Sequence, residues 1–320
     1  MSDVFGLVLP FFGLIFVGYV VARIARQPIE ALGWMNIFVI YVALPALFFQ
    51  LLSKTPIEKL TEWAFMFGSV FSTFIIFMAM FLSSLAFSRG EIAESTIRGL
   101  SAAYGNIGYM GPGLAILALG EQAAVPVALI FCFENIMHFT IAPMMMALAG
   151  SDKEPPLELA AGVVKKIALH PFIIATAFGV AAAAFGFHAP VALDRLLDYL
   201  AKAAAPCALF AMGVTLALRP LKRVPRELGA IALLKLVLHP ALCYVMLSLV
   251  GNFSPTWVFA AVLLASLPTA TNVFVIAQQY HVWVERASAS ILLTTVLSVG
   301  TVTALLYFIT SGMLPPDLFP

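Results

Sequence analysis

The sequence has few charged residues. Asp, Glu, Lys and Arg make up 10% of its 320 residues, and 62% of the residues are hydrophobic. A soluble globular domain has about 25% charged residues. The mean hydropathy of +1.03 therefore predicts an integral membrane protein. The formal net charge of +1 gives no basis for nucleic-acid binding, and we expect no nucleic-acid partner.

Cysteine is also scarce. Cys132, Cys207 and Cys243 all fall within apolar segments, and their spacing matches neither a metal site nor a disulfide framework. The sequence lacks the pattern G-x-x-x-x-G-K-[ST], so we expect no ATP-driven step and no cofactor. No basic region precedes the first apolar run, so we expect a retained first helix in place of a signal peptide.

Long apolar runs are what the sequence has in abundance. A helix that spans a membrane needs about 20 mostly apolar residues, and ten segments meet this requirement. Their connections are short, which predicts an all-α polytopic membrane protein without a soluble domain. The expected spans are 4–23, 31–53, 62–87, 95–120, 123–149, 160–186, 191–217, 227–250, 255–280 and 285–312.

The basic residues predict the orientation of these spans. Lys and Arg residues concentrate in cytoplasmic loops, and twelve of the 17 follow the odd-numbered spans, whereas only Lys54, Lys59 and Arg195 lie on the other side. We therefore expect both termini on the outer side of the membrane. The expected membrane is the inner membrane of a bacterium. The twelve residues are Arg23, Arg26, Arg89, Arg98, Lys153, Lys165, Lys166, Arg219, Lys222, Arg223, Arg226 and Arg286.

The second half of the sequence repeats the first at a shift of 161 residues. Because the repeat holds five spans, an odd number, its second copy enters the membrane from the opposite side, as in secondary transporters. We expect two inverted five-helix repeats, residues 1–150 and 151–320. Chance similarity within an apolar alphabet is the alternative. The aligned pairs include Pro10/Pro171, Gly18/Gly179, Pro45/Pro206, Phe49/Phe210 and Gly68/Gly229.

The repeat aligns two interruptions of apolar spans. NIGYMGPG, at Asn106–Gly113 in span four, aligns with LPTATNVF, at Leu267–Phe274 in span nine. Matched interruptions indicate a transporter binding site, because the half-helix that follows each one has a positive N-terminal end, roughly +0.5 of a charge. A packing kink is the alternative. The predicted substrate-binding residues are Asn106, Gly108, Tyr109, Pro112, Pro268, Thr269, Thr271 and Asn272.

These motifs, together with YVALPALFF in span two and LPTATNVFVIA in span nine, resemble those of the auxin efflux carrier family. The resemblance implies the fold of bile-acid symporters, with a scaffold from spans 1, 2, 6 and 7 and a mobile core from spans 3–5 and 8–10. It implies elevator-type movement and organic-anion substrates. It also implies that Pro45 and Pro206 bend scaffold helices beside the substrate path; an ordinary proline kink explains them equally well.

Four polar residues at membrane depth are candidates for coupling or balancing an ion. Ionisable residues inside a membrane usually have a function. Glu134, Asn135 and His138 lie in span five, where Glu134 and His138 share a helix face, and Lys235 lies in span eight. They could carry a proton or a cation, and Lys235 could balance an anionic substrate or pair with Glu134. Hydrogen bonding between core helices and snorkelling of Lys235 are the alternatives.

These patterns favour a secondary active carrier over other classes. The Glu134/His138 pair supplies too few groups for a metal site or a catalytic centre. We expect a small organic anion such as malonate or an auxin-like acid, driven by protons or membrane potential, with sodium coupling as the alternative. An anion channel or a receptor without transport is the second alternative. We also expect that two copies can pair through the scaffold helices.

Overall fold

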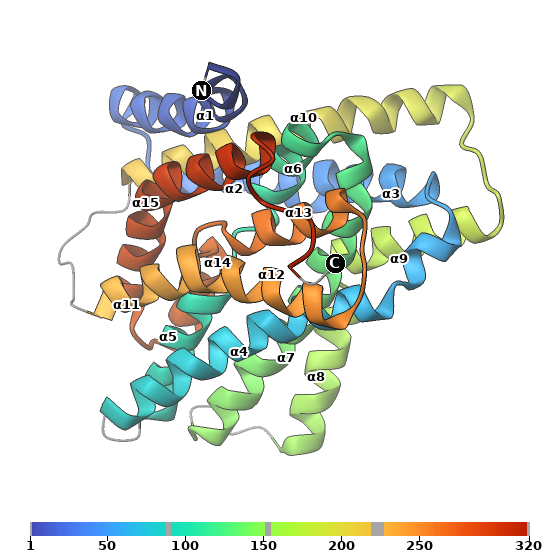
Figure 1. Cartoon of the computed structure of the whole chain (residues 1–320). Helices are drawn as coiled ribbons and strands as arrows, with labels where there is room; N and C mark the ends of the chain where they lie inside the picture. Colours follow the sequence, from blue (N-terminus) through green and yellow to red (C-terminus); the bar gives the residue numbers. More distant parts are fainter. Residues whose placement is uncertain (1, 88–90, 151–154, 219–226, 319–320) are drawn as a thin grey trace. The chain divides into compact units, whose positions relative to one another are not determined.

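The computed structural model describes residues 2–87, 91–150, 155–218 and 227–318, which are almost entirely helical (Figure 1). One antiparallel bridge, described below, is the only extended pairing in these ranges. The α-helices are α1 (Ser2–Ala25), α2 (Gly33–Phe38), α3 (Leu44–Ser53), α4 (Trp63–Phe87), α5 (Ile92–Ala103), α6 (Gly111–Leu119), α7 (Ala124–Leu148), α8 (Pro156–Ala168), α9 (Pro171–Ala184), α10 (Val191–Leu218), α11 (Glu227–Leu233), α12 (His239–Val250), α13 (Pro255–Ala265), α14 (Thr271–Gln279) and α15 (Val284–Thr310).

Short 3₁₀ and π-helical turns join some of these helices. Three are 3₁₀ turns, and two are π-helical turns that continue directly into the following helix. The 3₁₀ turns are η1 (Ile29–Leu32), η3 (Ile57–Thr61) and η4 (Glu121–Ala123), and the π-helical turns are η2 (Val39–Ala43) and η5 (Leu234–Leu238).

Six helical segments of the described chain are long and apolar enough to cross a membrane. Several pass through a 3₁₀ or π-helical turn without ending. Shorter apolar helices accompany them, so the chain is a polytopic membrane protein. The six segments are Ile29–Ser53, Trp63–Phe87, Glu121–Leu148, Val191–Leu218, Glu227–Val250 and Val284–Thr310.

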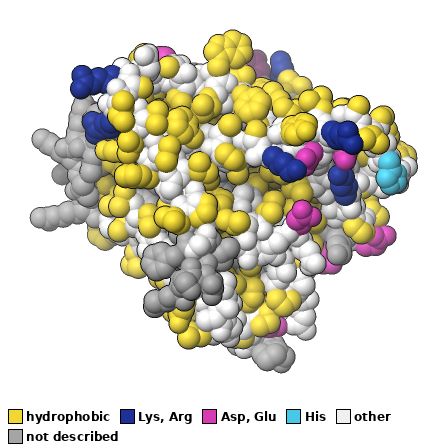
Figure 2. Space-filling model, turned by 90° about the horizontal axis from the view of Figure 1, so that it is seen from above, with side chains coloured by type: hydrophobic (Ala, Val, Ile, Leu, Met, Phe, Trp, Pro, Cys, Tyr) yellow, Lys and Arg dark blue, Asp and Glu magenta, His cyan; other side chains and the backbone are white. Residues whose placement is uncertain are grey.

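Large apolar side chains cover much of the exterior. The exposed fraction is 82% for Trp34 and 87% for Phe185, values that water would disfavour and lipid permits. Figure 2 shows many apolar side chains on the face in view, with charged side chains in a few groups among them. This distribution matches a protein whose surroundings are mostly hydrocarbon.

The chain divides into two compact units. Unit 1 contains residues 1–63, 108–132 and 168–220, and unit 2 contains residues 64–107, 133–167 and 221–320. Unit 1 therefore takes helices α1 to α3, α6, α9 and α10, and unit 2 takes α4, α5, α8 and α11 to α15. Helix α7 begins in unit 1 and continues into unit 2.

Close helix packing in unit 1 depends on two glycines. A Cβ on Gly18 of α1 would lie 2.2 Å from the backbone oxygen of Phe210 in α10. A Cβ on Gly179 of α9 would lie 2.9 Å from the Cβ of Leu52 and 3.3 Å from the backbone oxygen of Phe49 in α3. Any side chain at Gly18 would push the helices apart, because real Cβ atoms do not approach so closely.

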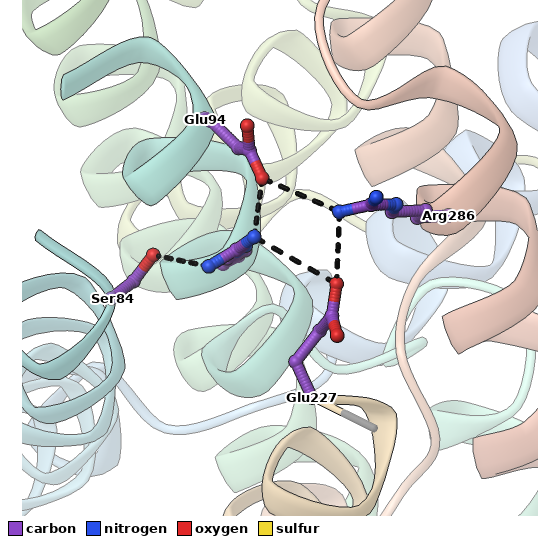
Figure 3. A network of polar contacts seen from close by, with 5 residues as sticks. Ser84, Glu94, Glu227 and Arg286 are labelled. Carbon is purple, nitrogen blue, oxygen red and sulfur yellow. Dashed lines mark hydrogen bonds and ion pairs between the residues drawn. The ribbon is translucent and has the colours of Figure 1, made fainter. Parts of the chain in front are cut away.

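In unit 2, a network of charged groups holds several helix ends together. The Arg98 guanidinium donates to Ser84 and pairs with Glu94, and it lies 3.7 Å from the carboxylate of Glu227. Arg286 lies 3.0 Å from Glu227 and 3.6 Å from Glu94, so charges of opposite sign alternate around the network (Figure 3). It joins α4, α5, α11 and α15.

The predicted sixth span is not one continuous helix. Helix α8 ends at Ala168 and α9 begins at Pro171. His170 between them is extended, with φ −69° and ψ 130°, because the ring of a following proline disfavours the helical conformation. Six of the basic residues used to predict orientation lie outside the described residues: Arg89, Lys153, Arg219, Lys222, Arg223 and Arg226.

Candidate functional site

Two extended segments pair with each other in unit 2. Helix α5 ends at Ala103 and α13 ends at Ala265, and residues 104–106 and 268–270 then run antiparallel. The N–H of Asn106 donates to the carbonyl of Pro268 at 2.7 Å, and the N–H of Ala270 donates to the carbonyl of Tyr104 at 2.9 Å. We call these two segments the crossover. Its pairing satisfies backbone groups that apolar surroundings would otherwise leave unpaired, at several kcal/mol each.

Thr269 joins the crossover to two neighbouring helices. Its hydroxyl donates to the carbonyl of Ser101 at 2.7 Å, one of the last carbonyls of α5, which have no donor within their own helix. Its backbone N–H donates to the Thr294 hydroxyl of α15 at 3.1 Å. Thr269 is fully buried, so the structure places this predicted substrate residue as a cap of α5.

Tyr104 is a site residue that the sequence reasoning did not select. Its hydroxyl accepts from the Asn272 amide of α14 at 2.9 Å and donates to the Asn135 oxygen of α7 at 2.5 Å. Its ring stacks on His138, with centroids 3.9 Å apart. The only proton of the Tyr104 hydroxyl goes to Asn135, so Tyr104 can only accept from Asn272. The NH2 group of the Asn272 amide therefore faces Tyr104, and its carbonyl oxygen faces away. Its position two residues before Asn106, at the start of the interruption, was the available signal.

Four further side chains form what we call the buried polar row. The Lys235 ammonium lies 2.9 Å from His239 Nδ1, and His239 Nε2 lies 2.9 Å from the Thr73 hydroxyl. The Thr73 hydroxyl donates to Glu134 Oε1 at 2.7 Å. All four residues are at most 3% exposed, so the row lies away from solvent.

The direction of donation along the buried polar row follows from its two ends. Thr73 has one proton and gives it to Glu134, so His239 Nε2–H must donate to Thr73. The unprotonated His239 Nδ1 then accepts from Lys235. The sequence offered Lys235 and Glu134 as candidates, with a direct pairing between them as one possibility; the fold shows that His239 and Thr73 stand between them.

Lys235 also closes the end of α13. Its ammonium donates to the carbonyl of Ala265, the last residue of that helix, at 2.6 Å. The π-helical turn η5 contains Lys235, and such turns are frequent at functional sites. A Cβ on Gly105 would lie 3.2 Å from Lys235 Nζ, so the glycine leaves room for the ammonium beside the crossover.

Some buried polar atoms next to these residues have no hydrogen-bond partner in the described part of the chain. They are Glu134 Oε2 and both ring nitrogens of His138. Buried polar groups are normally hydrogen-bonded. These atoms are therefore able to hold a proton, a water molecule or an ion.

The predicted site residues divide between the two units. Unit 2 brings together Asn106, Pro268, Thr269, Asn272, Glu134, Asn135, His138 and Lys235, with Thr271 as the first residue of α14. Unit 1 contains Gly108, Tyr109, Pro112, Pro45 and Pro206. Within unit 1, Gly108 lies against the ring of Phe131, Pro45 stands in the first turn of α3, and Pro206 lies inside α10.

An all-helical apolar chain with paired interruptions and buried ionisable groups has the features of a membrane transporter. The sequence model of a family described as "Membrane transport protein" matches residues 3–307. The chain therefore belongs to this family, the auxin efflux carrier family that its motifs resemble.

Individual relatives agree with this assignment. The chain is 64% identical over 320 residues, all of both chains, to a protein of Rhizobium meliloti (strain 1021) named "Putative malonate transporter". It is 24% identical over 308 residues to the "Uncharacterized transporter YfdV" of Escherichia coli (strain K12), covering 94% of this chain and 96% of the relative. It is also 24% identical to an "Uncharacterized transporter" of Methanothermobacter thermautotrophicus, covering 89% and 91%.

Proposed function

We propose that this protein is a secondary active carrier of small organic anions of the malonate class, which it binds at the crossover in unit 2. The observation that carries the proposal is the crossover, because α14 begins directly after one of its segments and the buried ammonium of Lys235 lies beside Gly105 of the other. Helix N-terminal ends and ammonium groups both attract anions. The 64% identity to the Rhizobium meliloti relative supports malonate as the first substrate to test.

We propose further that the chain is a ten-span inverted repeat. A shift of 161 residues takes α5 and α6 to 253–264 and 272–280, within two residues of α13 and α14. The same shift converts the Gly18–Phe210 contact into the Gly179–Phe49 contact, with the roles of the two halves exchanged. Chance similarity would not reproduce a contact in this exchanged form, so the observation supports the repeat.

Elevator-type movement remains part of the proposal. Unit 1 contains spans one, two and seven and the α9 part of span six, which favours it as the scaffold, although it also takes residues 108–132. The basic residues Arg98 and Arg286 belong to loops predicted to be cytoplasmic, and they meet in one network with Glu227. This meeting supports a common side for these loops. Inner-membrane location, outward termini and pairing of two copies are proposals of the same kind.

Uptake into proteoliposomes tests the proposed function. Purified protein should accumulate labelled malonate with saturable kinetics and exchange it for unlabelled malonate, whereas a channel would show neither counterflow nor carrier-like turnover. The assay should cover a panel of mono- and dicarboxylates, with pH, sodium and voltage gradients imposed separately. A well-folded protein that transports no carboxylate of the panel would refute the proposal.

Two substitutions at the crossover test the location of the site. Asn106→Ala and Asn272→Ala should each abolish malonate binding while the protein still folds. The change at position 106 keeps the backbone N–H that donates to Pro268, so the crossover pairing survives. Direct binding to purified protein is the measurement. Wild-type affinity in both variants would place the substrate elsewhere.

Glu134→Gln tests proton coupling. The carboxylate has one oxygen bound to Thr73 and one without a partner in the described chain, which makes it the best-placed proton carrier of the buried polar row. The amide cannot release a proton in the physiological range. We expect malonate uptake by the variant to lose its response to an imposed pH gradient. An unchanged response would make Glu134 a structural residue.

A further inference from the structure

The C-terminal end of α13 lies within the buried core of unit 2. Its last residue, Ala265, is 5% exposed, and Ser266 and Leu267 after it are 1% and 0% exposed. The end of a helix carries roughly −0.5 of a charge on carbonyls that lack donors in their own helix. In transporters with interrupted helices, such C-terminal ends coordinate the coupling Na⁺ or H⁺.

In this protein, a side chain occupies the corresponding position. The Lys235 ammonium donates to the carbonyl of Ala265 at 2.6 Å and is fully buried. Its second partner, His239 Nδ1, lies four residues further along the same helical segment. The charge cannot leave for solvent by snorkelling, because the whole residue is inaccessible and both contacts hold it in place.

We propose that Lys235 is a resident cation that takes the place of sodium at the end of α13, so that this carrier neither binds nor requires sodium there. The inference deepens the proposed function, and its test by malonate uptake rests on that function. A Na⁺ ion needs several oxygen ligands and would have to share the Ala265 carbonyl with an ammonium. Two cations this close in an apolar core would repel each other strongly.

The buried polar row balances the charge of this resident cation. Donation runs from Lys235 through His239 and Thr73 to the Glu134 carboxylate, so the row is neutral without an added ion. His239 and Thr73 are therefore positioning residues that act through their neighbours. Other titratable groups in electrostatic contact with the row are His138, Tyr104 and Cys243; they add no permanent charge when neutral.

The first test measures the thermal unfolding of the detergent-solubilised full-length protein. Wild-type protein in sodium chloride and in choline chloride of equal concentration should unfold at the same temperature. Lys235→Ala should unfold at a lower temperature, because it leaves Glu134 and the α13 carbonyls uncompensated. Ethylammonium or sodium should restore about 2–4 °C to the variant and nothing to the wild type, through binding at the vacated position.

A matched control is available on the surface. Lys202 of α10 forms an ion pair with Asp198 at 2.6 Å, and its side chain is 73% exposed. Lys202→Ala should unfold like the wild type in every salt, because exposed ion pairs contribute little. Restoration of this control by ethylammonium to the same extent would show a general amine effect and would overturn the assignment to Lys235.

The second test uses the wild type alone and does not depend on the folding of a variant. Malonate uptake should be the same with a sodium gradient and with a choline gradient. Sodium-specific stabilisation of the wild type, or uptake driven by the sodium gradient, would overturn the proposal. If the wild type transports no carboxylate, the proposed function fails, yet the unfolding data still decide whether sodium binds. The proposal would also be overturned if neither ethylammonium nor sodium raised the unfolding temperature of Lys235→Ala.

Discussion

The two helix ends that meet at the crossover are closed in different ways. Helix α5 presents the carbonyl of Ser101 to the neutral hydroxyl of Thr269, whereas α13 presents the carbonyl of Ala265 to the ammonium of Lys235. Both donors are fully buried; Thr269 belongs to the extended part of the crossover and Lys235 to η5. The backbone pairing is common to both ends, while the side chains make one end neutral and the other charged.

This difference lies in the charge of the group that closes each helix end. A neutral hydroxyl can close a helix end, so stability alone does not require an ammonium at α13. Placing a charge there makes Glu134 necessary as a counterion, and it makes Thr73 and His239 necessary as the connection. The charged end therefore needs a buried counterion, whereas the neutral end needs none.

Of the changes at the two helix ends, Lys235→Met should destabilise the protein most. It removes the buried cation and leaves Glu134 as an unpaired buried charge, which typically costs about 3–5 kcal/mol. The expected result is a marked fall in the temperature of thermal unfolding in detergent. Adding Glu134→Gln should recover much of the loss, because the double variant has no uncompensated charge. A single variant as stable as the wild type would contradict this account.

Thr269→Val should have a smaller effect at the neutral end. The variant keeps the size of the side chain and the backbone N–H, but it leaves the Ser101 carbonyl without its donor. An unsatisfied buried acceptor costs about 1–3 kcal/mol. The same unfolding assay measures it, with Thr269→Ser as the control that retains the hydroxyl. Equal losses for the valine and serine variants would show that packing, and not the hydrogen bond, matters at this position.

Tyr104→Phe should have the smallest effect on stability and a selective effect on binding. The ring can still stack on His138, but the hydroxyl bonds to Asn272 and Asn135 are lost. We expect malonate affinity to fall about 5- to 10-fold, equivalent to about 1 kcal/mol, with an unchanged maximal rate of uptake. A double-mutant cycle with Asn272→Ala, measured by the temperature of thermal unfolding, should show non-additive losses. Additive losses would separate Tyr104 from the orientation of Asn272.

Much of the helical frame could be predicted from the sequence, because long apolar runs and breaks by glycine and proline are local signals. Seven predicted spans coincide with continuous helical segments to within a few residues, and the interruptions in spans four and nine coincide with the helix ends at Ala103 and Ala265. The break in the sixth span was missed because a proline within an apolar run does not by itself tell whether the helix continues. Pro10 lies inside α1, whereas Pro171 begins α9.

The contacts of the candidate site were less accessible to prediction. Lys235, Glu134, His138 and Asn272 stand out because polar residues are rare in apolar spans. Tyr104, Thr73 and His239 were not selected, since their importance depends on which side chains approach from other helices. Thr73 lies 61 residues from Glu134 and 166 from His239 in the sequence, and no local pattern encodes these distances. The role of each selected residue in binding stays a prediction.

The charged network of Arg98, Glu94, Glu227 and Arg286 has a mechanical consequence for the crossover. Arg98 belongs to α5, the helix that leads directly into Tyr104, and its partners belong to α11 and α15. A displacement of α5 along its axis would therefore also pull on α11 and α15 through this network. The network therefore couples the positions of α5, α11 and α15 next to the crossover.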